Sequence, residues 1–261
     1  MNAQAAASPP PPAALHEALE ASWPAAARHR CGPFTLREGM GGGKRVSAAT
    51  LDDAASADGA AIARAEAMMR GMGQPPIFMI RAAGAAPGDA RLDAALAARG
   101  YEMVDPTLFF ACPASAITRA PGPMFLFGLW PPLAVQRQLW DEAGIGSARQ
   151  AVMARACTPR RAFVARHSNR AAGVAFCAID TETGIAMLHA LEIEPGFRRQ
   201  GVARDMVQAI AHWAEEAGAA HFALAVTERN IAARALYAGL GMAEAGRYHY
   251  RQLLDPPQES P

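Results

Sequence analysis

The sequence has almost no lysine, few cysteines and no long apolar run, and each shortage excludes a class of protein. Lys44 is the only lysine among 25 basic residues, and the net charge of +1 creates no strong field toward nucleic acid or an anionic membrane. The four cysteines form no CxxC pair, which argues against a metal site or a disulfide framework. No segment approaches the roughly 20 apolar residues of a membrane span. We therefore expect a cytoplasmic protein with reduced thiols that binds no nucleic acid, membrane or metal.

The chain of 261 residues is long enough for two domains of ordinary size, and about half of its residues are hydrophobic. A boundary is indicated within residues 112–123, where three prolines, a glycine and small residues separate two apolar runs. The predicted division is a disordered lead-in (1–12), an N-terminal domain (13–118), a second domain (119–255) and a disordered tail (256–261).

The first half alternates helical and extended patterns, which predicts an α/β unit. We expect helices over 13–23, 60–72 and 92–99, and strands over 34–37, 44–49, 76–80 and 101–111. The glycine-rich segment 39–43 lacks the spacing of a phosphate-binding GxxxxGK[ST] loop, so a hairpin turn is predicted there. Pro106 lies inside the last strand and suggests an edge position or a bulge.

The second half shows the same alternation more regularly. The expected strands are 124–127, 162–166, 173–179, 185–193, 222–226 and 248–253, and the expected helices are two within 132–156, then 201–217 and 231–240. The three strands between 162 and 193 are separated by short turns, which predicts an antiparallel meander.

The segment that follows the strand over 185–193 has the composition of an anion-binding turn. It reads Arg198-Arg199-Gln200-Gly201-Val202-Ala203 and enters a helix at once. The first turn of a helix exposes unpaired N–H groups and a partial positive charge, which suit a phosphate. Gly201 lets a ligand approach the backbone, and the two arginines add charged donors. Taken alone, this hexapeptide could equally be an ordinary turn with solvated arginines.

Two signatures together resemble the GNAT family of acetyl-CoA-dependent N-acetyltransferases. Arg198, Gly201 and Ala203 fit its pyrophosphate pattern Q/R-x-x-G-x-G/A, after an Ile-Glu-Pro approach. About thirty residues later, residues 230–242 resemble its N-x-x-A-x-x-L-Y-x-x-x-G-F signature, with Met242 in place of phenylalanine. The resemblance covers residues 124–253 and implies the GNAT α/β (α+β) fold, a mixed and mostly antiparallel sheet flanked by helices.

The resemblance also assigns roles to individual residues. Tyr237 would act as the acid that protonates the leaving thiolate. The residues expected to bind acetyl-CoA, the cosubstrate, are Leu191, Glu192, Ile193, Arg198, Arg199, Gln200, Gly201, Val202, Ala203, Asn230 and Ala233. A backbone N–H of the strand over 185–193 would stabilise the oxyanion when a deprotonated amine attacks the thioester directly.

A base is needed because an amine is mostly protonated at neutral pH. His189 occupies the position that carries a glutamate base in some relatives, and the pKa of a histidine suits the role. Simple packing of His189 in the strand is nearly as well supported. Glu192 and Glu194 are further candidates, but strand alternation would place both on the face opposite to His189.

The first half resembles the degenerate GNAT-like N-terminal domain of two-domain bacterial relatives. The resemblance to a degenerate domain implies that this half does not bind CoA. The predicted function is transfer of acetyl from acetyl-CoA to a primary amine of a small molecule, a peptide or a protein. The alternatives are a regulatory module of GNAT fold that binds acyl-CoA without turnover, and transfer of a longer acyl group. A homodimer is left open.

Overall fold

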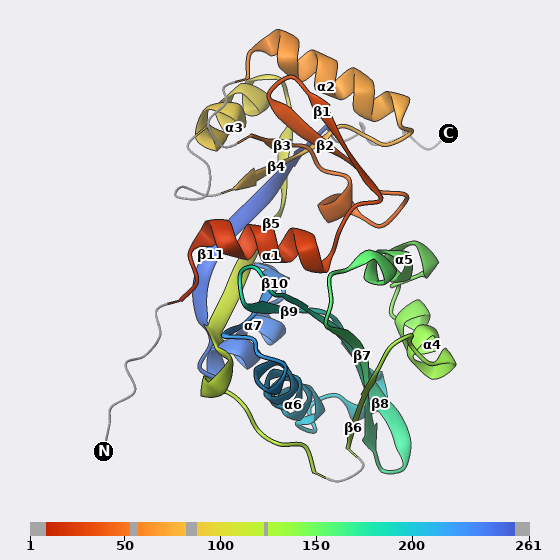
Figure 1. Cartoon of the computed structure of the whole chain (residues 1–261). Coiled ribbons are helices and arrows are strands. Elements are labelled where there is room, and N and C mark those ends of the chain that lie inside the picture. Colours follow the sequence, from red (N-terminus) through yellow and green to blue (C-terminus); the bar gives the residue numbers. More distant parts are fainter. Residues whose placement is uncertain (1–8, 53–56, 82–87, 123–124, 254–261) are drawn as a thin grey trace, which may run out of the picture. The chain divides into compact units, whose positions relative to one another are not determined.

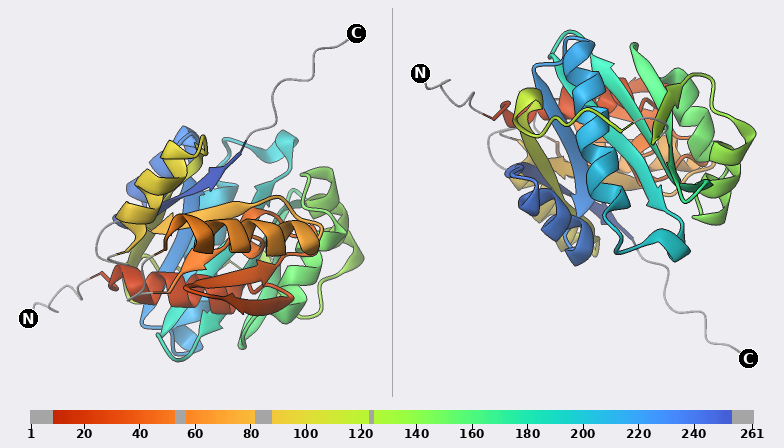
Figure 2. Two further views of the ribbon diagram at one scale, coloured as in Figure 1. Left: turned by 90° about the horizontal axis from the view of Figure 1, so that it is seen from above. Right: turned by 90° about the horizontal axis from the view of Figure 1, so that it is seen from below.

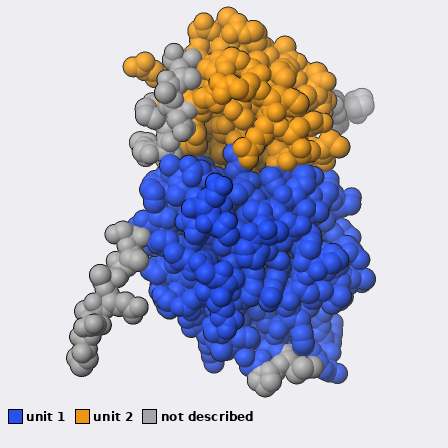
Figure 3. Space-filling model, in the orientation of Figure 1, with its two compact units in different colours: residues 1–24, 108–226, 230–246 blue, residues 25–107, 227–229, 247–261 orange. Residues whose placement is uncertain are grey.

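The computed structural model describes residues 9–52, 57–81, 88–122 and 125–253. The chain forms two compact units, each assembled from separate stretches of sequence (Figure 3). Unit 1 contains residues 1–24, 108–226 and 230–246, and unit 2 contains residues 25–107, 227–229 and 247–261. The predicted division at 118 and 119 partitions the chain differently and stays a prediction. Residues 1–8 and all of the predicted tail lie outside the described residues.

Unit 1 is built on a mixed sheet that is mostly antiparallel. Its main strands are β6 (Leu126–Leu129), β7 (Arg160–His167), β8 (Arg170–Asp180), β9 (Ile185–Ile193) and β10 (His221–Thr227). Strands β6 to β9 pair antiparallel in chain order, and β10 runs parallel to β9. The predicted meander is therefore confirmed. Parts of β5 (Glu102–Pro113) and β11 (Ala243–Gln252) complete the unit.

Helices cover both faces of this sheet (Figures 1 and 2). They are α1 (Pro12–Ser22), α4 (Ala134–Glu142), α5 (Ser147–Arg155), α6 (Val202–Glu216) and α7 (Ile231–Gly239). Figure 1 shows α1 on one side of β8 and β9 and α6 on the other. Helix α6 buries a stripe of apolar residues at helical spacing, including Met206, Ile210 and Ala214, against the sheet. This packing fixes where the N-terminus of α6 meets the end of β9.

Unit 2 has its own apolar core between strands and two helices. Strands β1 (Ala27–Cys31), β2 (Phe34–Glu38) and β3 (Thr50–Leu51) form an antiparallel sheet, and β4 (Ile77–Arg81) pairs with the end of β11. Helices α2 (Gly59–Gly71) and α3 (Asp89–Ala98) complete the unit. Phe34, Phe78 and Tyr101 stack edge to face in its core. The elements agree with a second, GNAT-like arrangement of sheet and helices.

Two details of the first half differ from the prediction. Residues 44–49 are not a strand: η1 (Lys44–Val46) is a turn of 3-10 helix, and β2 pairs with β1, which the sequence pattern missed, and with β3. The glycine-rich segment is therefore not a hairpin turn. The segment instead makes tertiary contacts: Lys44 Nζ lies 2.8 Å from Asp105 Oδ2, and Gln74 Nε2 donates to the Ser47 carbonyl over 3.2 Å. Asp105, before Pro106, has a φ of 46°, so the backbone of β5 is irregular next to the proline. Strand β5 has a neighbour on each side, and it is therefore not an edge strand.

Candidate functional site

The two parallel strands of unit 1 separate along their length. The parallel register pairs residues 185–188 of β9 with residues 221–224 of β10 and ends there, whereas β9 continues to Ile193 and β10 to Thr227. Backbone groups beyond the register on the facing edges of β9 and β10 can pair with an extended ligand, as an added strand would. The sequence predicted both strands but not the point at which they part.

Strand β9 contains a bulge at this same point. The register with β8 shifts between Val174 and Phe176, and Ala190 has a φ of 50°, which is left-handed and unusual for a residue with a Cβ. Leu188 before the bulge and Leu191 after it both pack against the core cluster that contains α6. The alternation of side chains therefore changes phase at the bulge. It follows that His189 and Glu192 lie on the same face, which corrects the simple alternation expected from the sequence.

The predicted anion-binding turn connects the end of β9 to α6. A short 3-10 turn, η3 (Pro195–Phe197), leads to Arg198, whose Nε donates to the Ile193 carbonyl over 3.1 Å. Gly201 is the N-cap of α6, with a φ of 85°, and it provides no side-chain hydrogen bond to the helix. A Cβ built on Gly201 would meet no atom within 4 Å. The first N–H groups of α6 therefore start beside open space that could receive an anion.

Helix α7 carries the second signature. The Asn230 side chain caps this helix by accepting a hydrogen bond from the Ala233 N–H at 3.1 Å. Tyr237 is 7% exposed, and its ring lies 5.9 Å from that of Phe110. Burial, together with the negative charge of Glu192, raises the pKa of Tyr237 to about 12. The hydroxyl therefore keeps its proton throughout the physiological pH range.

Glu192 is near enough to Tyr237 for its charge to act on the phenol. Its side chain is half-buried on β9, and this burial raises the pKa of the carboxyl group, while Arg198 lowers it in part. Arg198, Glu192 and Tyr237 thus belong to one electrostatic group that links the turn, β9 and α7. The sequence named all three residues, but it did not indicate that Glu192 and Tyr237 interact.

His189 is buried on β9 against helix α1. Its Nε2 lies 2.8 Å from Ser22 Oγ, and its ring lies 5.0 Å from Trp23 and 6.2 Å from Phe176. The Ser22 hydroxyl is 2.6 Å from the Ala18 carbonyl, to which it donates its hydrogen. With that donation, Ser22 Oγ accepts from His189 in the tautomer that carries its proton on Nε2.

Three residues beside the predicted site were not found from the sequence. Ser22 and Trp23 contact His189 across more than 160 positions of the chain, and Trp140 Nε1 donates to the Ala190 carbonyl over 2.9 Å. No spacing rule connects such distant residues. Within the described ranges, no group of three or more His, Cys, Asp or Glu side chains could hold a metal ion, and no described helix is both long and apolar enough to cross a membrane.

Comparison with known proteins is consistent with this geometry. Residues 128–242 match the model of the acetyltransferase (GNAT) family. A GCN5-related N-acetyltransferase from Kribbella flavida has a similar structure, with a TM-score of 0.65 and 17% identity over 94% of this chain and 97% of that one. A functionally unknown conserved protein from Staphylococcus epidermidis gives a TM-score of 0.61 and 11% identity over 87% and 93% of the two chains.

A tandem GNAT protein from the clavulanic acid biosynthesis pathway is also similar, with a TM-score of 0.53 and 17% identity over 80% of this chain and 76% of that one. No match was found among curated proteins. At these identities the structural likeness establishes the fold alone. Residues 128–242 of this chain match the acetyltransferase (GNAT) family, and the chain has the mixed α/β fold of that family.

Proposed function

We propose that the protein is an N-acetyltransferase that transfers the acetyl group of acetyl-CoA to a primary amine by direct attack. The observation that carries this proposal is that β9, beyond the end of its register with β10, carries Glu192, whose charge acts on Tyr237, and leads to the Gly201 turn. A turn that suits an anion and a protonated phenol, both next to the same strand, fit a ligand that has phosphates at one end and a thioester at the other.

The residues of the turn would bind the pyrophosphate of CoA. The backbone N–H groups of Gln200, Gly201, Val202 and Ala203 would donate to the phosphates, with Arg198 and Arg199 as charged donors. Arg199 has a φ of 62° and Gly201 a φ of 85°, so the turn bends twice through left-handed backbone. The amide-bearing pantetheine arm would pair with the backbone of residues 191–193, near Asn230 and Ala233.

The chemical step would occur where β9 bulges. A backbone N–H beside Ala190 would donate to the oxyanion formed as the amine attacks the thioester carbonyl. The bond between the acyl carbon and sulfur then breaks, and Tyr237 would donate a hydrogen bond to the leaving thiolate. His189 is proposed as the base that accepts the amine proton, directly or through water, with Glu192 on the same face as the alternative.

The acceptor is proposed to be a primary amine of a small molecule, a peptide or a protein, and the cytoplasm to be the site of action, in keeping with free cysteines. The rival function is binding of acyl-CoA as a regulatory signal without turnover. Retention of a buried tyrosine at the thioester end favours turnover, because ligand binding alone needs only the turn.

The test compares two glycine substitutions on one helix. Gly201→Ala and Gly218→Ala each place a Cβ on left-handed backbone, with φ of 85° and 92°, and neither Cβ would meet a protein atom within 4 Å. Each should lose a similar, small amount of stability, roughly 1–2 kcal/mol. Gly201→Ala should weaken acetyl-CoA binding in calorimetry at least tenfold, and Gly218→Ala should not. Equal affinities would exclude the turn as the phosphate site.

Turnover is then tested by release of CoA thiol from acetyl-CoA with a panel of amines. Release that depends on an amine supports the transferase. Tight binding of acetyl-CoA without release for small amines, peptides and proteins would instead support the regulatory module.

A further inference from the structure

The bulge in β9 brings one of its backbone carbonyls into contact with a side chain of helix α4. In a regular antiparallel pair each inward carbonyl accepts from the neighbouring strand, but the register between β8 and β9 skips at Ala190. The Ala190 carbonyl instead accepts a hydrogen bond of 2.9 Å from the indole Nε1 of Trp140, on helix α4. Ala190 is half-buried, and such a partner replaces part of the hydration that its carbonyl loses.

Trp140 is rigidly placed to make this contact. Its side chain is fully buried, and so is that of Gln136, one turn earlier on the same face of α4. Gln136 Oε1 accepts from the Leu133 N–H at 2.7 Å and fixes the first turn of the helix. At the other end, the Ile145 N–H donates to the Trp140 carbonyl over 2.7 Å. The indole therefore reaches β9 from a helix that is stabilised by hydrogen bonds at both of its ends.

The bulge matters because it decides which way the following residues face. Loss of one inserted residue from a strand register would move every later side chain to the opposite face. Glu192 would then no longer lie on the face of His189, and Leu191 would leave the core cluster. The backbone N–H groups beside Ala190 would also return to the ladder with β8 and would not be available to the thioester.

We propose that Trp140 is a positioning residue for acyl transfer: its indole N–H binds the Ala190 carbonyl and thereby maintains the bulge that aims the backbone of β9 at the thioester. This inference rests on the proposed function for its catalytic consequence. The hydrogen bond itself and its effect on β9 can be tested separately from any activity.

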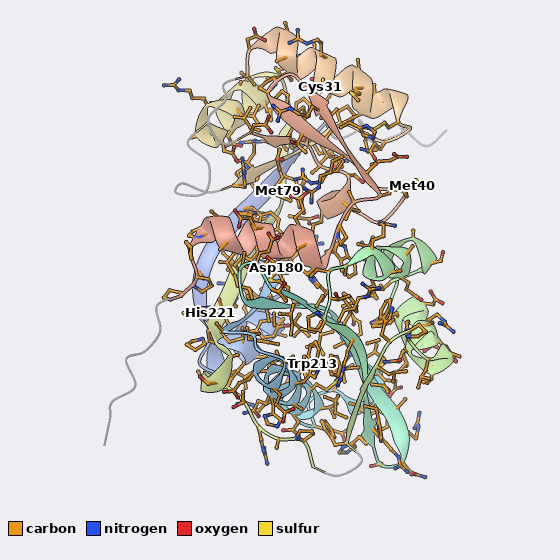
Figure 4. The ribbon with its side chains drawn as sticks, viewed as in Figure 1. Cys31, Met40, Met79, Asp180, Trp213 and His221 are labelled. Carbon is orange, nitrogen blue, oxygen red and sulfur yellow. The ribbon has the colours of Figure 1, made fainter. Side chains whose placement is uncertain are left out.

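The experiment begins with Trp140→Phe, which keeps an aromatic ring and removes the N–H. The matched control is Trp213→Phe on α6, the tryptophan labelled in Figure 4. Its ring centroid lies 5.2 Å from that of Phe163, and the guanidinium of Arg161 lies over the same ring. Three quantities are measured on the full chain: kcat for acetyl transfer, the Kd of 3′-phospho-ADP, which contains only the phosphate end of CoA, and hydrogen–deuterium exchange of the β9 amides.

Trp140→Phe should lower kcat on the order of 10- to 100-fold, leave the Kd of 3′-phospho-ADP within about twofold of wild type, and speed exchange over residues 188–193. Trp213→Phe should change none of the three. Wild-type kcat together with wild-type exchange in Trp140→Phe would overturn the proposal. If the wild-type protein itself transfers no acetyl group, the proposed function fails, while the exchange comparison still decides whether Trp140 maintains the bulge.

A second variant covers the case in which Trp140→Phe is too unstable to assay and also separates positioning from general packing. Glycine adopts the left-handed backbone of Ala190 without a Cβ clash. The double variant Trp140→Phe with Ala190→Gly should therefore regain at least threefold in kcat over the single variant, or fold where that variant does not. Failure of Ala190→Gly to restore either activity or slow exchange would show that the indole acts only by filling space.

Discussion

Replacing Tyr237 by phenylalanine isolates the contribution of one hydroxyl to the proposed reaction. The ring would remain in its buried place beside Phe110, because tyrosine and phenylalanine have the same shape up to the oxygen. The hydroxyl is proposed to face the sulfur of the leaving thiolate. Its pKa is raised to about 12 by burial and by Glu192. The wild-type phenol is consequently a weak acid that stays protonated near neutral pH.

That pKa sets the size of the expected effect. A cysteine thiol has a pKa of about 8.5. With that value for the leaving thiol, complete proton transfer from Tyr237 to the thiolate would be uphill by about 5 kcal/mol, at about 1.4 kcal/mol per pKa unit. Tyr237 should therefore stabilise the thiolate through a hydrogen bond rather than by giving up its proton. A hydrogen bond to a charged group contributes about 1.5–3 kcal/mol, which corresponds to a fall in kcat of about 10- to 150-fold.

The assay measures kcat and KM by CoA thiol release, and the Kd of acetyl-CoA by calorimetry. Tyr101→Phe is the control, since it removes another buried hydroxyl, one that donates to Glu66 Oε1 at 3.0 Å in unit 2. Tyr237→Phe should lower kcat with little change in Kd, and Tyr101→Phe should leave kcat unaltered. A kcat within threefold of wild type for Tyr237→Phe, or a loss confined to Kd, would refute the reasoning.

The same pKa predicts how the rate should depend on pH. The protonated phenol is the donor, and it is lost only as the pH rises through the pKa of about 12. The wild-type rate should therefore show no alkaline decline caused by Tyr237 between pH 7 and about 10. A decline in that range that disappears in Tyr237→Phe would mean that the phenol ionises far more easily than its burial indicates.

Three further predictions follow from buried groups. His189→Gln should shift the acidic limb of the pH–rate profile, and an unmoved limb would transfer the role of base to Glu192. Glu192→Gln should lower the pKa of Tyr237, which an absorbance titration of the phenolate against Tyr237→Phe would detect; an unchanged pKa would show that the two groups do not interact. Burial raises the pKa of Cys112 to about 12, above about 8.5 in the unfolded chain, so the stability it contributes is intact below pH 8.5 and declines as the pH rises toward 12. The free energy of unfolding, measured with urea, should fall between pH 8 and pH 10 by about 2 kcal/mol less in Cys112→Ala than in wild type. Equal falls in the two proteins would contradict the burial of a protonated thiol.

The local elements of this protein were predictable because their signals are local. Helix α6 follows from apolar residues at helical spacing and ends near Gly218, and helix α7 begins at the capping side chain of Asn230. The turn at Gly201 was predicted as a phosphate site because a second signature of the same family follows it about thirty residues later. The strand expected over residues 44–49 is absent, and that segment instead makes tertiary contacts, such as that of Lys44 with Asp105, which a local pattern does not contain.

The relations between these elements were decided by the tertiary structure alone. A bulge inserts one residue into a strand and reverses the faces of all that follow, and its position depends on pairing with β8 and on the indole of Trp140. For that reason the prediction from simple alternation, which placed Glu192 on the face opposite to His189, was wrong. The partner of His189 is Ser22, 167 positions earlier, which no spacing rule reaches. The sequence by itself determined the family signatures and the turn that suits a phosphate; packing determined which side chains meet around it, because burial and pairing depend on residues that are distant along the chain.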